Sequence, residues 1–227
     1  MYMKRMVYAA MFVLLAGSMV VPQPASALRL SLNAGGGAVE IDLTDNGAGD
    51  ANGALDAITF IGSVSNWRIN VATGINIGSS TQPRLDLNSV NVSDGGGGTM
   101  QLMLTETGFT TPPAFSFLAA IGGTASNRVQ YQTYWDAGNN AFATTTPLTS
   151  SGLLGPGAFA DTRGGLGGGV GPFSVTQVVT ITHLSGNNVT SSFDAEISTV
   201  PEPASMLLLG SGLLGLGLWG RKMRKSA

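Results

Sequence analysis

The stretch Val175-Thr176-Gln177-Val178-Val179-Thr180-Ile181 is the clearest guide to the fold of this chain. Apolar side chains at positions 175, 179 and 181 share one parity, and threonines at 176 and 180 share the other. A period of two is typical of a β-strand with one buried face and one wet face. Valine, isoleucine and threonine also favour pleated surfaces. The stretch therefore predicts a strand of an antiparallel sheet.

The same alternation recurs along the middle of the chain, in short segments separated by clusters of Gly, Asn, Asp, Ser or Pro, and no internal stretch sustains a helical period. We expect about nine strands. They lie near residues 39–43, 58–61, 67–71, 85–92, 100–104, 115–119, 129–135, 175–182 and 193–197. Strands with one wet face pack as two layers, so the predicted fold class is all-β, an antiparallel two-sheet sandwich that is jelly-roll-like.

Two glycine-rich regions are expected to be loops. Asp94-Gly95-Gly96-Gly97-Gly98 fits a hairpin loop that joins Val92 to Met100. The longer stretch from Pro147 to Pro172 contains a second glycine tract, and it predicts a mobile, irregular crossover. Neither tract is followed by Gly-Lys-Ser, so neither predicts a phosphate-binding loop.

The charges divide the chain into a middle and two ends. Between residues 28 and 200 lie five arginines, no lysine and twelve acidic residues, a net charge of −7. Such a segment repels phosphate backbones, so nucleic acid is not an expected partner. The chain has no cysteine and one histidine, which excludes disulfides, thiolate metal sites and multi-histidine centres.

The N-terminus has the three parts of a secretory signal peptide, predicted over residues 1–27. Lys4-Arg5 is followed by an apolar run and then by the small-residue site Ala25-Ser26-Ala27. Ala25 and Ala27 would guide a signal peptidase that cuts after Ala27. The ectodomain is then expected over residues 28–199, exported through the inner membrane.

The C-terminus, residues 200–227, has a second ordered set of features. Val200-Pro201-Glu202-Pro203 comes first, then an uncharged run rich in leucine and glycine, then the basic end Arg221-Lys222-Met223-Arg224-Lys225. The prolines favour an extended segment. The apolar run is nearly long enough to cross a bilayer as a helix, with its basic end in the cytoplasm. We expect a C-terminal transmembrane helix.

This tail closely resembles the PEP-CTERM sorting signal of exopolysaccharide-producing Gram-negative bacteria. The resemblance rests on Val200, Pro201, Glu202 and Pro203, the glycine-bearing apolar run and the arginine-rich end. It implies recognition by an exosortase, with a transient stage in the inner membrane and delivery to the cell surface or extracellular matrix. The chain from Leu30 to Pro113 also resembles an ectodomain that recurs among PEP-CTERM proteins, which implies a location but no activity.

An acidic loop is the first candidate binding site. Asp42, Asp45, Asp50 and Asp56 offer hard oxygen ligands of the kind that calcium prefers, among glycines that allow tight wrapping. The spacing is not that of an EF-hand, and the same residue types build ordinary β-turns. Both interpretations stay open, so calcium is a candidate ligand and no other cofactor is expected.

Aromatic side chains are the second candidate. Trp67, Tyr131 and Trp135 would stack on sugar rings if they lay exposed on one sheet, although such rings are more often core. His183 sits on the apolar parity of its strand without a nucleophile elbow, which favours a packed histidine over a catalytic one. We therefore expect no enzyme. The main hypothesis is a structural surface protein associated with exopolysaccharide or biofilm, and the alternative is a carbohydrate- or calcium-binding module.

Overall fold

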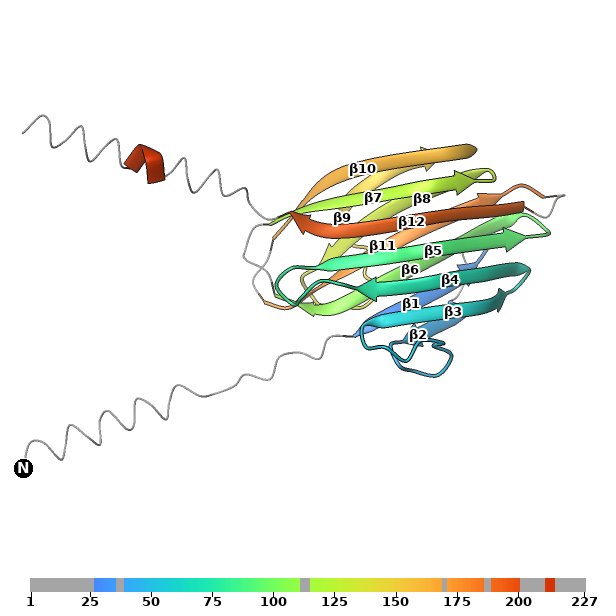
Figure 1. Ribbon diagram of the computed structural model, residues 1–227, viewed down its shortest axis with the longest axis horizontal. Helices are drawn as coiled ribbons and strands as arrows, with labels where there is room; N and C mark the ends of the chain where they lie inside the picture. Colours follow the sequence, from blue (N-terminus) through green and yellow to red (C-terminus); the bar gives the residue numbers. More distant parts are fainter. Residues whose placement is uncertain are drawn as a thin grey trace, which may run out of the picture.

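The computed structural model describes residues 27–35, 39–110, 115–168, 171–185, 189–200 and 211–214. Within them, twelve strands form two antiparallel sheets (Figure 1). The first sheet has the order β2 (Ile41–Thr44), β1 (Leu28–Ala34), β6 (Gly98–Phe109), β11 (Phe173–His183), β8 (Arg128–Asp136), β9 (Thr146–Leu154). The second has the order β10 (Gly157–Gly167), β7 (Phe115–Ala125), β12 (Val189–Val200), β5 (Arg84–Asp94), β4 (Trp67–Asn76), β3 (Ala57–Val64).

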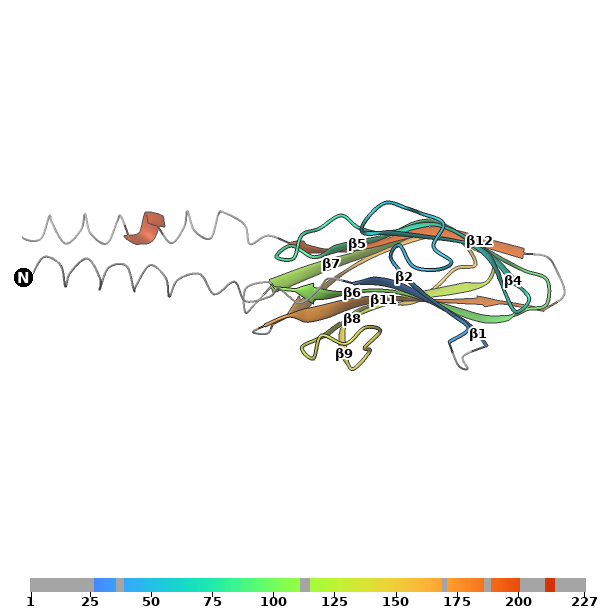
Figure 2. The same ribbon diagram turned by 90° about the horizontal axis from the view of Figure 1, so that it is seen from below.

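The two sheets stack face to face as the layers of a sandwich (Figure 2). Their inward-facing side chains form one hydrophobic core, to which β11 contributes Val175, Val179 and Ile181. The predicted all-β class and the two antiparallel sheets are thus confirmed. The alternation seen in the sequence has its expected cause, because one parity of each strand faces the other sheet.

Part of the outer face of the first sheet is covered by a loop and is not exposed to solvent. The connection between β8 and β9, residues 137–145, folds over it: the Phe142 N–H donates to Thr105 Oγ1 at 3.3 Å, and the Gly108 N–H donates to Asn139 Oδ1 at 2.7 Å. Thr105 and Thr176 are fully buried there and share a hydrogen bond of 2.9 Å. The outward threonines of β11 are therefore not uniformly exposed.

The glycine tract after Asp94 does not form a hairpin. β5 belongs to the second sheet and β6 to the first, so residues 95–97 carry the chain from one layer to the other. Gly97 and Gly98 have φ values of +77° and +128°, which side chains rarely tolerate. An added Cβ at Gly97 would also come within 2.5 Å of the Ser185 nitrogen. The prediction of a hairpin loop was wrong, because glycine content marks a turn but not the sheets it joins.

The stretch from Pro147 to Pro172 is not an irregular crossover either. It contains most of β9 and all of β10, and β10 pairs with β7 along its whole length, from Gly157 to Gly167. Gly165 allows a close approach between the edges of the two sheets, since an added Cβ would lie 2.5 Å from the Leu148 carbonyl oxygen. Glycine has no side chain to show a period of two, which is why the pattern missed this strand.

The two targeting segments lie largely outside the described residues. Of the predicted signal peptide only Ala27 is described, so Ala25 is not placed. Of the C-terminal segment, Val200 ends β12 and residues 211–214 form a helical turn, while Pro201, Glu202 and Pro203 are not placed. No helix in the described part of the chain is long and apolar enough to cross a membrane.

Candidate functional site

Asp42, Asp45 and Asp50, three of the aspartates predicted to bind calcium, accept hydrogen bonds from nearby groups of the chain. Asp42 forms an ion pair with Arg29 across the β1–β2 hairpin. Asp45 accepts backbone hydrogen bonds from Asp56 at 3.0 Å and from Ala57 at 3.4 Å. These contacts fasten the start of β3 to the loop that precedes it.

Asp50 has the most contacts of the four. Its Oδ1 accepts from the N–H groups of Asn52, at 2.8 Å, and Thr59, at 2.9 Å, and its Oδ2 accepts from Asn46 at 3.0 Å. Among the described residues, no three carboxylate or histidine groups are placed to share a metal ion. The structure therefore does not bring the four aspartates together as one ligand set, and Asp42, Asp45 and Asp50 have local partners.

The predicted aromatic platform is not on the surface. Trp67 is 1% exposed and Tyr131 is 2% exposed, both within the core, and Trp135 is half-buried with its ring edge-to-face on Phe173. The Tyr131 hydroxyl donates to Gln177 Oε1 at 2.5 Å, and burial raises its pKa well above the ordinary value. The prediction of sugar stacking was wrong for Trp67 and Tyr131, because their parity is that of the core.

His183 ends β11 as a packed residue. Its ring lies 4.8 Å from the Trp67 ring, centroid to centroid, and its Nε2 is 2.8 Å from Ser191 Oγ. That oxygen also accepts from the Ser126 N–H at 3.0 Å. Ser191 is fully buried, so this His–Ser pair ties three strand ends together and offers no exposed nucleophile.

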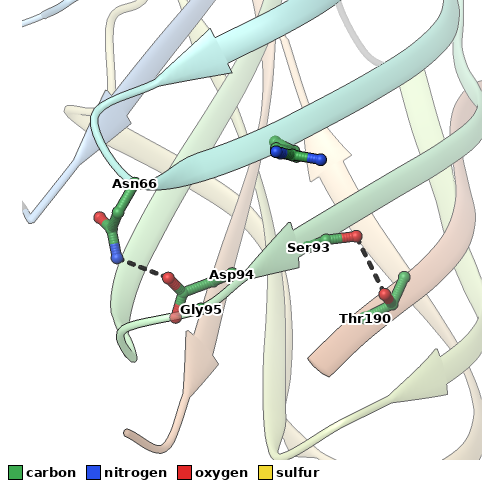
Figure 3. A pocket seen from close by; sticks show the side chains of 6 residues that line it. Asn66, Ser93, Asp94, Gly95 and Thr190 are labelled. Carbon is green, nitrogen blue, oxygen red and sulfur yellow. Dashed lines mark hydrogen bonds between the residues drawn. The ribbon is translucent and has the colours of Figure 1, made fainter. Parts of the chain in front are cut away.

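A cleft lies elsewhere in the described part of the chain, at one end of the second sheet. It has a volume of about 520 Å³ and is lined by Asn66, Arg68, Ser93, Asp94, Gly95 and Thr190 (Figure 3). These residues come from the β3–β4 turn, from β4, from β5 and the loop after it, and from the start of β12. We call it the Arg68 cleft.

A row of side chains on neighbouring strands forms one wall of the Arg68 cleft. Ser93 lies opposite Arg68 on β4 and opposite Thr190 on β12, so the three face outward side by side. The Ser93 and Thr190 hydroxyls are 2.9 Å apart and hydrogen bonded. The residues before and after Ser93, Val92 and Asp94, are buried, as the alternation requires.

Asp94 holds the other wall in place. It is 2% exposed, and its carboxylate accepts hydrogen bonds from Asn66 Nδ2 and from the N–H groups of Gly96 and Gly97. These bonds fix both the β3–β4 turn and the crossing loop, and Figure 3 shows the Asn66 amide directed at Asp94. The negative charge of the cleft is therefore buried and already hydrogen bonded.

Arg68 is the exposed charge of the cleft. Arg29, Arg84 and Arg163 form ion pairs with neighbouring acids, whereas Arg68 has no ion pair within the described part of the chain. No sequence motif singles out Arg68. Arg68 alternates with the apolar residues Trp67 and Ile69, which indicates that it faces solvent. Ser93 and Thr190 are distant from it along the chain, and only strand pairing brings the three residues together.

A shallower groove of about 340 Å³ lies farther along the same face. Ala120 and Gly122 line it together with the acidic residues Asp86, Asp194 and Glu196. Burial, and then the charges of Glu196 and Asp194, raise the pKa of Asp86. Arg84 partly balances this acidity through an ion pair with Glu196 at 2.9 Å.

The fold is a two-sheet antiparallel β-sandwich. The outer face of its second sheet is polar and contains the Arg68 cleft and the shallower groove. Residues 199–222 match the PEP-CTERM protein-sorting motif. The predicted resemblance is thereby confirmed: the chain carries the sorting signal of an exosortase substrate and is an exported surface protein. No curated protein matches the sequence.

Solved structures resemble the chain only weakly. A bacteriophage CBA120 tailspike protein 4 domain is similar over 59% of this chain and 19% of its own length, with 13% identity and a TM-score of 0.29. The K1 adhesin domain of Lys-gingipain from Porphyromonas gingivalis W83 is similar over 64% and 98%, with 11% identity and a TM-score of 0.32. TmCBM61, solved with β-1,4-galactotriose, is similar over 62% and 92%, with 13% identity and a TM-score of 0.31.

Proposed function

We propose that this chain is a non-enzymatic surface or extracellular-matrix protein that associates with exopolysaccharide after exosortase processing. The observation that carries the proposal is the outer face of the second sheet, joined to a sorting signal. Rows of hydroxyl and amide side chains cross this face, among them Ser93 beside Thr190 and Asn70 beside Asn91. Such groups exchange hydrogen bonds with sugar hydroxyls as readily as with water.

The route to the surface follows from the two ends of the chain. Export through the inner membrane of a Gram-negative cell, a transient stage in that membrane and release by the exosortase form one sequence of events. The enzyme would recognise Val200-Pro201-Glu202-Pro203. The partners are then the exosortase during sorting and extracellular polysaccharide afterwards, in a biofilm or capsule.

A carbohydrate-binding module is the second candidate, and the Arg68 cleft favours it. A module binds a defined saccharide at one site, whereas a matrix protein makes many weak contacts across a face. The predicted calcium role would belong to this second candidate, with an ion bridging the loop of Asp42, Asp45, Asp50 and Asp56. The local hydrogen bonds of Asp45 and Asp50 argue for a loop that folds without the ion.

Co-sedimentation of the full-length protein with exopolysaccharide purified from its host tests the proposal. We expect saturable sedimentation with the polymer and no release of reducing ends during a long incubation. Heat-denatured protein is the control for trapping. Absence of sedimentation above that control would contradict polysaccharide association, and steady release of reducing ends would contradict the non-enzymatic assignment.

A further inference from the structure

The Arg68 cleft has a distinct set of binding groups. Its exposed charge is positive, because Arg68 faces outward and the Asp94 carboxylate is buried under three hydrogen bonds. A guanidinium presents paired N–H donors that match the two oxygens of a carboxylate. The first feature expected of a ligand is therefore a carboxylate.

The remaining groups match hydroxyls. One O–H group of the Ser93 and Thr190 pair is used in the hydrogen bond between them. The other O–H donor and several oxygen lone pairs remain for a ligand. Asn66 gives one N–H to Asp94 and keeps a second N–H and its carbonyl oxygen. Groups that both donate and accept, held next to a cation, fit a ring whose hydroxyls neighbour a carboxylate.

The size and position of the cleft agree with such a ligand. Its volume of about 520 Å³ lies within the range of small-molecule sites, and its walls are fixed by strand pairing and by Asp94 rather than by long loops. It also lies at the end of the sandwich away from the sorting tail, because β12 begins beside the cleft at Val189 and ends at Val200. A bound polymer would therefore not meet the membrane end of the molecule.

We propose that the Arg68 cleft binds a uronate unit of an acidic polysaccharide. Arg68 contacts the sugar carboxylate, and Ser93, Thr190 and Asn66 contact the ring hydroxyls. This assignment rests on the proposed function, since it names the sugar class that the surface protein holds. The net charge of −7 between residues 28 and 200 excludes a general attraction for polyanions. Recognition must then depend on Arg68 itself and not on arginines elsewhere.

Isothermal titration of the full-length protein with trigalacturonate tests the assignment. Three matched probes separate the sources of binding: trigalacturonate, its methyl ester, which keeps the ring hydroxyls but loses the charges, and a triglutamate peptide, which keeps carboxylates but has no ring. We expect trigalacturonate to bind and each of the other two to bind at least about tenfold more weakly, the usual effect of losing a charged hydrogen bond.

The variants are Arg68→Gln and Arg128→Gln. Both remove one exposed positive charge, and Arg128 begins β8 in the other sheet, outside the cleft lining. We expect Arg68→Gln to weaken trigalacturonate binding about tenfold or more and Arg128→Gln to leave it unchanged. Both variants should have the same circular dichroism spectrum as the parent. Arg68→Lys keeps the positive charge but lacks the paired N–H donors of a guanidinium, so it should bind with intermediate affinity.

The outcomes separate this assignment from the proposed function. If the parent co-sediments with exopolysaccharide but binds the methyl ester or the peptide as well as trigalacturonate, the proposed function stands and the uronate assignment fails. Equal binding by Arg68→Gln and the parent would likewise overturn the assignment alone. A parent that neither sediments with the polymer nor binds trigalacturonate would end both.

Discussion

His183 is buried beside the Trp67 ring and the Ser191 hydroxyl, and burial favours its neutral form. It packs on Trp67, contacts Ser191 and lies within the electrostatic reach of Asp94. Burial lowers the pKa of His183, and the negative charge of Asp94 opposes this shift. Protonation would place a positive charge in the buried region where three strand ends meet.

The stability of the fold should fall as the pH drops below about 6.5, the ordinary pKa of histidine. Because the folded pKa is lowered, the unfolded chain binds more protons, so the free energy of unfolding decreases with falling pH until the folded histidine also titrates. One proton contributes at most about 1.4 kcal/mol per pH unit. Urea unfolding at pH 7.5 and pH 5, followed by tryptophan fluorescence, measures the difference.

His183→Gln is the matched variant for this prediction, since it keeps a polar side chain and removes the titration. The loss of stability between the two pH values should be smaller in the variant than in the parent. An equal loss in both proteins would mean that other groups cause the dependence. Asp86 is not such a group, because its raised pKa gives an effect of the opposite sign.

Pairing between β7 and β12 depends on the absence of a side chain at one position. Gly123 lies opposite Phe193, and an added Cβ would meet the Ser192 carbonyl oxygen and lie 2.7 Å from the Phe193 Cα. Both obstacles are backbone, which cannot rotate away. The neighbouring Gly122 is different, because an added Cβ would find only the Phe159 oxygen, at 3.7 Å.

Gly123→Ala should lower the free energy of unfolding by about 1–3 kcal/mol, as other overpacked interiors do. Gly122→Ala is the control: it should be neutral or raise stability by up to about 1 kcal/mol, because alanine loses less entropy on folding than glycine. Chemical denaturation of the two variants beside the parent provides the measurement. Similar stabilities for both would show that β12 can shift to accept the methyl group.

Asp50 makes more hydrogen bonds than Asp45 in the loop between β2 and β3. Asp50 accepts three backbone hydrogen bonds, from Asn46, Asn52 and Thr59. The loop therefore has its own internal scaffold. The same residue types would serve a bound cation, so stability measurements with and without the ion distinguish the two roles.

Asp50→Ala should destabilise the fold by about 1–3 kcal/mol, because partly buried N–H groups lose their acceptor. We expect the loss to be the same in EDTA and in millimolar calcium, with no change in the parent Tm between the two conditions. Asp161→Ala, which removes an exposed ion pair with Arg163, should cost less than about 1 kcal/mol. A calcium-dependent rise in the parent Tm that Asp50→Ala abolishes would restore the metal interpretation.

The sandwich as a whole is asymmetric along its length. β1 begins and β12 ends at one end, because Leu28 lies opposite Glu106 and Ser198 lies opposite Arg84 (Figure 1). The Arg68 cleft occupies the other end, about 30 Å away at the rise per residue of a strand. Processing at one end can therefore proceed without disturbing a ligand at the other.

Replacement of Pro201, Glu202 and Pro203 by alanine should stop processing and leave the full-length protein in the inner membrane. Deletion of Pro201 to Ala227 should instead give secretion without sorting, since the apolar run and basic end are absent. Cell fractionation with immunoblotting follows both variants, and the parent in a host lacking the exosortase is the control. Normal trimming of the alanine variant would refute recognition through this motif.

The fold class and the sorting signal could both be predicted from the order of residues. A period of two, as in β11, is a local consequence of the pleat, and the sorting signal is a linear order of residues that another protein recognises. The sequence could not show which solvent-facing side chains become neighbours on adjacent strands. It also missed β10, whose glycines carry no period, and could not tell that Trp67 and Tyr131 are core.

The tertiary structure alone decided the candidate site. Arg68, Ser93 and Thr190 belong to β4, β5 and β12, and they meet only because β5 pairs on one edge with β4 and on the other with β12. Contact between the two sheets likewise brings His183 of β11 against Trp67 of β4. Register between strands distant along the chain is set by the packing of the entire core, and no single strand carries that information.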